Sequence, residues 1–209
     1  MGSIYNEYGE YKNAENIFHE AINCTTPTMK MYYQLALTYG NQGNYMSAIL
    51  AFQEALKLEP DDVEIKYQLG VAYMEIGDLT IAAQYFEEYV SVNLQDEIAF
   101  FLLGKCYIEI NDYLAALLVL QQANVLSPNN HQILYYTGLS YSGLGEESDA
   151  ALIFRKALKI NPEDPEIYFA LGKSYYKLNK NKKVRETLDI LNMLDRNLWY
   201  QLRNEIGAR

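Results

Sequence analysis

The residue types that most often hold metals or act as nucleophiles are scarce in this chain of 209 residues. It has two histidines, His19 and His131, and two cysteines, Cys24 and Cys106. Neither histidine has a second His or Cys at the spacing that zinc sites use. The sequence therefore predicts no metal site.

Carboxylates recur in two similar stretches, EPDDVE (residues 59–64) and NPEDPE (residues 161–166). Each precedes a segment with helical periodicity, where Asp commonly caps the first turn of a helix. Acids that act as a general acid and base need a protected cleft, and these junctions are expected to be exposed. The sequence also lacks a glycine-rich phosphate loop. We therefore expect a protein that is not an enzyme and uses no cofactor.

The composition argues against several kinds of partner and location. A formal charge of −10 disfavours nucleic-acid binding, because phosphate contacts need clustered cations. No apolar run is long enough to insert into a membrane, and the N-terminus lacks the pattern of a signal peptide. Cys24 and Cys106 fall in helical patterns and are expected to be reduced core thiols, as in a cytoplasmic protein.

The sequence repeats at an interval of 34 residues: YQLGVAYMEIGD begins at residue 67 and FLLGKCYIEIND at residue 101. Residues 34 apart form columns that keep one type, namely tyrosine, a very small residue, alanine, or a large apolar residue. These columns are Tyr5, Tyr39, Tyr73, Tyr107, Tyr141 and Tyr175; Gly2, Ala36, Gly70, Gly104, Gly138 and Gly172; Ala14, Ala48, Ala82, Ala116 and Ala150; and Phe18, Phe52, Phe86, Leu120, Phe154 and Leu188.

Each unit of 34 residues reads as two helical segments, for example residues 63–76 and 79–91, separated by Gly77-Asp78. Pro60, Pro128 and Pro162 end three of the units. A helical hairpin of this size cannot bury its apolar side alone, so it must stack on its neighbours. The very small residues let the first helix of a hairpin approach the second closely.

These columns resemble the tetratricopeptide repeat (TPR) family over residues 1 to about 191. The resemblance implies an all-α, right-handed superhelical solenoid of helical hairpins that serves as a binding scaffold. Members that clamp a C-terminal carboxylate use Lys, Asn and Arg on the inner wall of the superhelix. The corresponding positions here are Tyr33, Leu37, Gln68, Ile98 and Leu102, so we expect no such clamp.

We expect one array over residues 1–209. It would contain a partial repeat at 1–28, full repeats at 29–62, 63–96, 97–130, 131–164 and 165–198, and an overlapping capping helix at 195–209. Because the chain begins inside a repeat, it is expected to be a fragment of a longer protein. No Gly or Pro separates the capping helix from the preceding one, which permits one continuous helix. Trp199 is interpreted as a plug over the last hairpin or as a partner anchor.

Packing within the hairpin does not explain an aromatic column, Tyr33, Tyr67, Phe101, Tyr135 and Phe169, on another face of the first helices. The resemblance places this column on the inner wall, and we predict a groove for a protein or peptide with apolar anchors. The alternative is that these rings only pack against neighbouring first helices. The predicted groove residues are Tyr33, Leu37, Tyr67, Val71, Met74, Phe101, Lys105, Ile108, Tyr135, Leu139, Phe169, Lys173 and Tyr176.

Charge is distributed unevenly along the chain. Residues 173–209 contain nine Lys or Arg and four Asp or Glu, whereas residues 1–172 contain eight and 23. The predicted basic end consists of Lys177, Lys180, Lys182, Lys183 and Arg185. It is interpreted as a solvated turn, or as a dock for an acidic partner, a membrane surface, or the acidic end of another copy. A self-assembling scaffold and a regulatory module of a larger protein are therefore alternatives to the peptide-binding adaptor.

Overall fold

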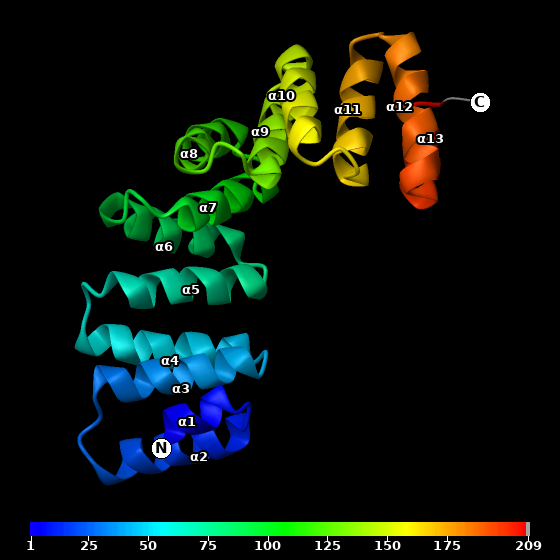
Figure 1. Cartoon of the computed structure of the whole chain (residues 1–209). Coiled ribbons are helices and arrows are strands. Elements are labelled where there is room, and N and C mark those ends of the chain that lie inside the picture. Colours follow the sequence, from blue (N-terminus) through cyan, green and yellow to red (C-terminus); the bar gives the residue numbers. More distant parts are fainter. Residues whose placement is uncertain (208–209) are drawn as a thin grey trace. The chain divides into compact units, whose positions relative to one another are not determined.

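The computed structural model describes residues 1–207, and all the regular elements in that range are α-helices (Figure 1). The chain divides into two compact units, Met1–Leu94 and Gln95–Arg209. Unit 1 contains three helical hairpins. Its helices are α1 (Gly2–Glu7), α2 (Tyr11–Cys24), α3 (Met29–Asn41), α4 (Tyr45–Leu58), α5 (Val63–Glu75) and α6 (Leu79–Val92).

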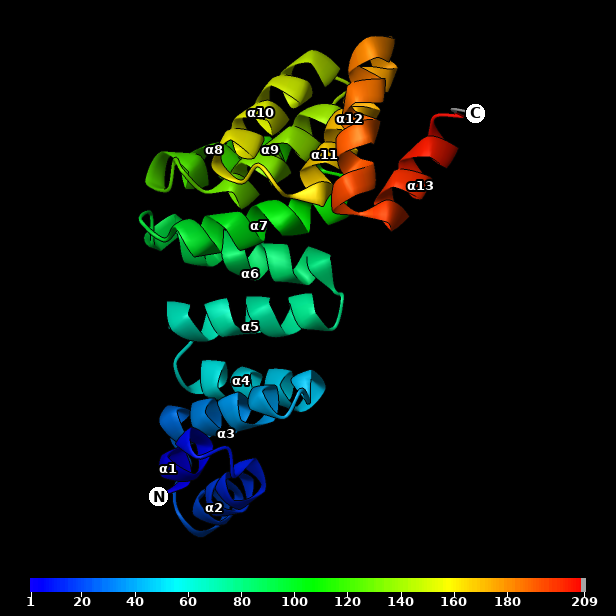
Figure 2. The same ribbon diagram turned by 45° about the vertical axis from the view of Figure 1, so that its right-hand side comes forward.

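Unit 2 contains three further hairpins and a last helix, α13, which packs against α11 and α12 (Figure 2). Its helices are α7 (Glu97–Glu109), α8 (Tyr113–Leu126), α9 (His131–Gly143), α10 (Glu147–Ile160), α11 (Pro165–Lys177), α12 (Asn181–Leu194) and α13 (Arg196–Glu205). The predicted all-α fold built from helical hairpins is confirmed. The division into numbered repeats of one array stays a prediction.

The carboxylates of the two junction stretches cap helices, as expected. Asp62 Oδ1 accepts a hydrogen bond from the Ile65 backbone N–H at 3.0 Å, at the start of α5. Asp164 does the same for the first turn of α11, accepting from Glu166 N at 3.1 Å. Each carboxylate satisfies backbone donors that have no partner within the helix.

Each hairpin turn contains a residue in the left-handed backbone region. Glycine occupies this position in most hairpins, as at Gly43 (φ 73°) and Gly77 (φ 82°). Asn111 (φ 63°) and Asn179 (φ 57°) replace it in the hairpins α7–α8 and α11–α12. Asparagine tolerates this conformation better than other non-glycine residues, so the turn is preserved where glycine is lost.

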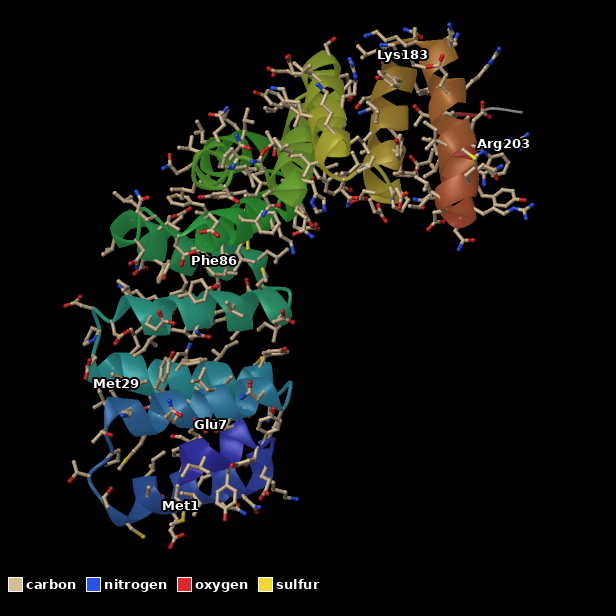
Figure 3. The ribbon with its side chains drawn as sticks, in the orientation of Figure 1. Met1, Glu7, Met29, Phe86, Lys183 and Arg203 are labelled. Carbon is tan, nitrogen blue, oxygen red and sulfur yellow. The ribbon has the colours of Figure 1, made fainter. Side chains whose placement is uncertain are left out.

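The column of very small residues brings the two helices of a hairpin together. A Cβ added to Gly70 would lie 2.9 Å from the Phe86 ring, and one added to Gly138 would lie 2.5 Å from the Phe154 ring. Both rings are fully buried, and Figure 3 shows Phe86 between α5 and α6. In each hairpin the ring of the second helix therefore lies directly on the backbone of the first.

The last hairpin departs from this arrangement. A Cβ on Gly172 would meet Leu202 of α13 at 2.5 Å, and Leu188, the expected partner, is only half-buried. Leu202 is fully buried. The terminal helix therefore supplies the apolar side chain that the second helix supplies elsewhere.

Two expectations about the sequence were wrong. The last two helices are not continuous, because Asp195 adopts an extended conformation (φ −147°, ψ 108°) and its carboxylate caps α13 through the backbone N–H of Asn197 at 2.8 Å. The final two residues of the predicted capping helix, 208 and 209, lie outside the described residues. Cys24 is exposed at the end of α2, whereas Cys106 is buried as expected and burial raises its pKa to about 11.

The glycine contacts lead to a prediction about stability. Replacing Gly138 with alanine is expected to lower the free energy of unfolding by about 1–3 kcal/mol, because the new methyl group overpacks a rigid buried ring. The matched control is Gly40→Ala in α3, where nothing lies within 4 Å of the added Cβ. There the change is expected to stabilise by about 0.5–1 kcal/mol through the better helix propensity of alanine. Urea unfolding followed by circular dichroism measures both, and a stabilised Gly138→Ala variant would contradict the packing account.

Candidate functional site

The predicted groove residues lie on the first helices of the hairpins in both units. Within unit 1 these are Tyr33, Leu37, Tyr67, Val71 and Met74, and all five are half-buried. In unit 2 they are Phe101, Lys105, Ile108, Tyr135, Leu139, Phe169, Lys173 and Tyr176, which are half-buried apart from Tyr176, 46% exposed. Their role in binding stays a prediction.

One side of the aromatic column is used for packing. The Tyr33 ring lies 5.6 Å from the Phe52 ring, Tyr67 lies 5.7 Å from Phe86, and both pairs are edge-to-face. Tyr135 contacts Phe154 at 6.0 Å in the same way, with tilted rings. Burial, helped by the charge of Glu166, raises the pKa of Tyr135 to about 12, so its hydroxyl stays neutral at physiological pH. The alternative interpretation therefore holds in part, because these rings stack on their own hairpin.

The other side of the column borders a hollow between α9 and α11 in unit 2. This α9–α11 hollow has a volume of about 340 Å³. Five predicted groove residues line it, and they come from α7, α9 and α11. The lining residues are Ile108, Tyr113, Tyr135, Leu139, Ser142, Gly143, Phe154, Glu166, Phe169, Ala170, Lys173 and Lys177.

A small residue at one position leaves this hollow open. Ala170 of α11 lies in its wall, and the residue 34 positions earlier is Tyr136 of α9. The Tyr136 ring lies 5.3 Å from the Phe101 ring of α7 and 5.7 Å from Lys105 Nζ, so it fills the matching space between α7 and α9. Tyrosine occupies the earlier position and alanine the later one, and this difference accounts for the open hollow.

Unit 1 has a smaller hollow at the equivalent place between α3 and α5, with a volume of about 200 Å³. The residue at the position of Ala170 is Gln68, an intermediate filler. Leu37 and Val71 are the predicted groove residues in its wall. The lining residues of this α3–α5 hollow are Ala36, Leu37, Gly40, Asn41, Tyr45, Ala48, Phe52, Gln68, Val71 and Ala72.

A buried ion pair stands at the edge of the α9–α11 hollow. The Glu147 side chain is 8% exposed and accepts a hydrogen bond from Lys177 Nζ at 2.5 Å. The Ser142 hydroxyl donates to the same carboxylate at 3.0 Å. Lys177 was predicted as part of the basic end, and the structure places it in the wall of this hollow instead.

The second lysine of the hollow is also paired. Lys173 Nζ lies 2.9 Å from Glu205 of α13 and 5.3 Å from the centre of the Phe169 ring. The hydrogen bond from Lys173 holds the pKa of the Glu205 carboxyl below its usual value. Both lysines of the α9–α11 hollow therefore have carboxylate partners within the chain.

The remaining residues of the predicted basic end do not form one patch. Lys180 and Lys182 are exposed, and Lys183 lies over the Tyr175 ring at 5.1 Å. Figure 3 shows Lys183 near the turn between α11 and α12. Arg185 lies in the wall of another hollow, between α11, α12 and α13.

This α11–α13 hollow has a volume of about 430 Å³ and repeats the position of the other two, with α13 taking the place of a following first helix. Trp199 is half-buried, packs on the core of unit 2 and lines the hollow, and Arg203 lies over its ring at 5.0 Å. The lining residues are Tyr176, Asn181, Val184, Arg185, Leu188, Asp189, Trp199, Arg203 and Ile206.

Two searches of the described residues bear on other kinds of site. Among residues 1–207, no group of three or more His, Cys, Asp or Glu side chains is arranged to hold a metal ion. In the same range, no helix has the length and apolar character needed to cross a bilayer.

Comparison with protein families identifies the chain. Models described as "Tetratricopeptide repeat" match residues 33–97 and 67–131, and one described as "TPR repeat" matches residues 148–179. The protein belongs to the tetratricopeptide repeat family, and neither description indicates a catalytic family. No curated protein sequence matches the chain.

Solved structures with the same fold cover most of the chain. MamA 41-end from Desulfovibrio magneticus RS-1 is 24% identical with a TM-score of 0.76, covering 81% of this chain and 96% of that one. A second MamA crystal structure is also 24% identical, with a TM-score of 0.76, and covers 80% and 92%. YrrB, described as a TPR protein with an unusual peptide-binding site, is 20% identical with a TM-score of 0.78 and covers 90% and 97%.

Sequence reasoning missed two features of the site. The column Gln68, Leu102, Tyr136 and Ala170 varies in size, and this variation signals where a hollow stays open. The burial of Glu147 had no signal within its own segment, because its partner Lys177 lies 30 residues away.

The buried ion pair gives a second prediction. Lys177→Met would leave the Glu147 carboxylate buried with only Ser142 as a partner, and is expected to destabilise the protein by about 1–3 kcal/mol. Lys182→Met is the control, because Lys182 is 92% exposed and lies 4.0 Å from Glu186, so no measurable change is expected. Thermal and urea unfolding of both variants would show the difference, and equal stabilities would mean that Glu147 does not depend on Lys177.

Proposed function

We propose that this protein is a non-catalytic adaptor that binds a partner peptide or helix through apolar anchor side chains. The α9–α11 hollow receives the main anchor, and Tyr135, Leu139 and Phe169 surround it. Lys173 and Lys177 lie at the edge of the hollow and are held by Glu205 and Glu147, so its apolar interior provides most of the binding energy.

The observation that carries this proposal is the α9–α11 hollow itself. Its volume of about 340 Å³ is sufficient for one large side chain, and its aromatic and aliphatic lining resembles that of typical ligand pockets. Stacking of the hairpins holds the wall in place before a ligand arrives, which lowers the ordering cost of binding. The likeness to YrrB, a TPR protein with a peptide-binding site, agrees with this use of the fold.

The test fills the hollow without removing any wall residue. Ala170→Tyr places a ring where Tyr136 already fills the space between α7 and α9. A library of peptides with single apolar anchors is screened by fluorescence anisotropy against the intact chain and this variant. We expect the intact chain to select anchored peptides and the variant to bind them at least about tenfold more weakly.

The matched control adds the same ring elsewhere. Gln122→Tyr lies on the exposed side of α8 and is expected to leave peptide binding unchanged. A cooperative melt of the Ala170→Tyr variant is required, and Phe169→Ala replaces it if the added ring unfolds the chain. If the filled and intact chains select the same peptides with equal affinity, the α9–α11 hollow is not the binding site.

The second candidate function is self-assembly, and exposed apolar side chains in the first hairpin favour it. Met1 is 83% exposed, Ile4 54% and Tyr8 79%, within a stretch that is acidic overall. In this function the basic C-terminal end of one copy contacts this N-terminal hairpin of another, giving head-to-tail chains or rings. Sedimentation velocity then shows a mass that rises with protein concentration and falls with salt. A constant monomer mass would eliminate self-assembly.

A further inference from the structure

We propose that the α11–α13 hollow binds a carboxylate side chain, Asp or Glu, of the same peptide whose apolar anchor occupies the α9–α11 hollow. This inference rests on the proposed function and identifies the chemistry of the partner. A peptide that fits both hollows combines one large apolar residue with one acidic residue at a set distance.

The first argument comes from the position of the hollow. Tyr176, Asn181, Val184 and Leu188 line it at the places that Gly40, Tyr45, Ala48 and Phe52 occupy in the α3–α5 hollow, 136 residues earlier in the chain. The α11–α13 hollow is therefore another copy of the same structural pocket. Helix α11 separates it from the α9–α11 hollow, so one ligand passing over α11 reaches both.

The second argument comes from charge. Two arginines, Arg185 and Arg203, and one acid, Asp189, line the α11–α13 hollow, which leaves a net charge of one positive unit. A single carboxylate neutralises this charge. A dianionic phosphate exceeds it and also faces Asp189, which makes the carboxylate the better match.

The third argument comes from the pairing of the cations nearby. Lys173 is held by Glu205 and Lys177 by Glu147, so the α9–α11 hollow has no unmatched positive charge. Arg185 is exposed, and within residues 1–207 it forms no ion pair. A guanidinium suits this role because it presents a planar fork of donors that fits a carboxylate with two hydrogen bonds.

The aromatic rings orient the second arginine. Arg203 lies over the Trp199 ring at 5.0 Å, which holds its guanidinium plane at the wall of the hollow. Figure 3 shows Arg203 beside α12. Trp199 therefore positions a cation as well as covering the last hairpin.

The spacing of the two hollows sets the spacing in the ligand. Neighbouring helices pack roughly 10 Å apart, and an extended chain advances about 3.3 Å per residue. The acidic residue should therefore lie about three positions from the apolar anchor if the peptide binds in an extended form.

The experiment uses a synthetic peptide with one central phenylalanine and a glutamate three residues away on each side. Its twins have glutamine or phosphoserine in place of both glutamates. Binding to the intact chain is measured by isothermal titration calorimetry at low salt. We expect the glutamate peptide to bind about tenfold more tightly than the glutamine twin and more tightly than the phosphoserine twin.

Two variants assign this preference to the hollow. Arg185→Gln, and Arg185→Gln combined with Arg203→Gln, should reduce the preference for glutamate over glutamine to about onefold. Arg155→Gln, an exposed arginine on α10, should keep the full preference. Arg185 is exposed, so its single variant tests the proposal even if the double variant unfolds.

The outcomes separate this inference from the proposed function. If the glutamate and glutamine peptides bind equally to the intact chain and Ala170→Tyr abolishes both, the adaptor function stands and the carboxylate site is wrong. If phosphoserine binds most tightly, the assignment to a carboxylate is overturned. If Arg155→Gln loses the preference as strongly as Arg185→Gln, the charge effect does not belong to the hollow. If no peptide binds the intact chain, both proposals fail.

Discussion

The close contact between a backbone glycine and a buried ring underlies the rest of this structure. At Gly138 the Phe154 ring lies where a Cβ would be, and the same contact recurs between Gly70 and Phe86. This contact sets how near the two helices of a hairpin lie. Since a hairpin cannot bury its apolar side alone, it also sets the surface on which the next hairpin stacks. In the last hairpin Leu202 of α13 takes over this contact and ends unit 2 with a separate helix.

Because the packing columns hold the backbone in register, neighbouring positions are free to vary in size and charge. Tyr136 fills the space between α7 and α9, whereas Ala170 leaves the α9–α11 hollow open. In the α11–α13 hollow, Arg185 and Arg203 make the equivalent space positive. One scaffold thus presents filled, apolar and charged positions in succession within unit 2, which suits recognition of a peptide by several side chains.

Much of the fold was predictable from the sequence because its determinants repeat. The glycine, alanine and phenylalanine columns, and Asp62 and Asp164 at helix starts, each appear at a fixed interval. The site was less predictable, because it depends on contacts between units that sequence spacing does not show. The pairing of Glu147 with Lys177 is one such contact, and the packing of Tyr67 on Phe86 is another. The break at Asp195 was missed because a cap, and neither Gly nor Pro, ends the preceding helix.

The central claim is that an apolar anchor of the partner enters the α9–α11 hollow. The most direct measurement is a set of intermolecular nuclear Overhauser effects between a phenylalanine-anchored peptide and the methyl groups of the chain. The account predicts contacts from the peptide ring to Leu139 and Ala170, which line the hollow. Contacts instead to Leu114 and Leu118, 60% and 62% exposed on the outer side of α8, would contradict it and place binding on the second helices.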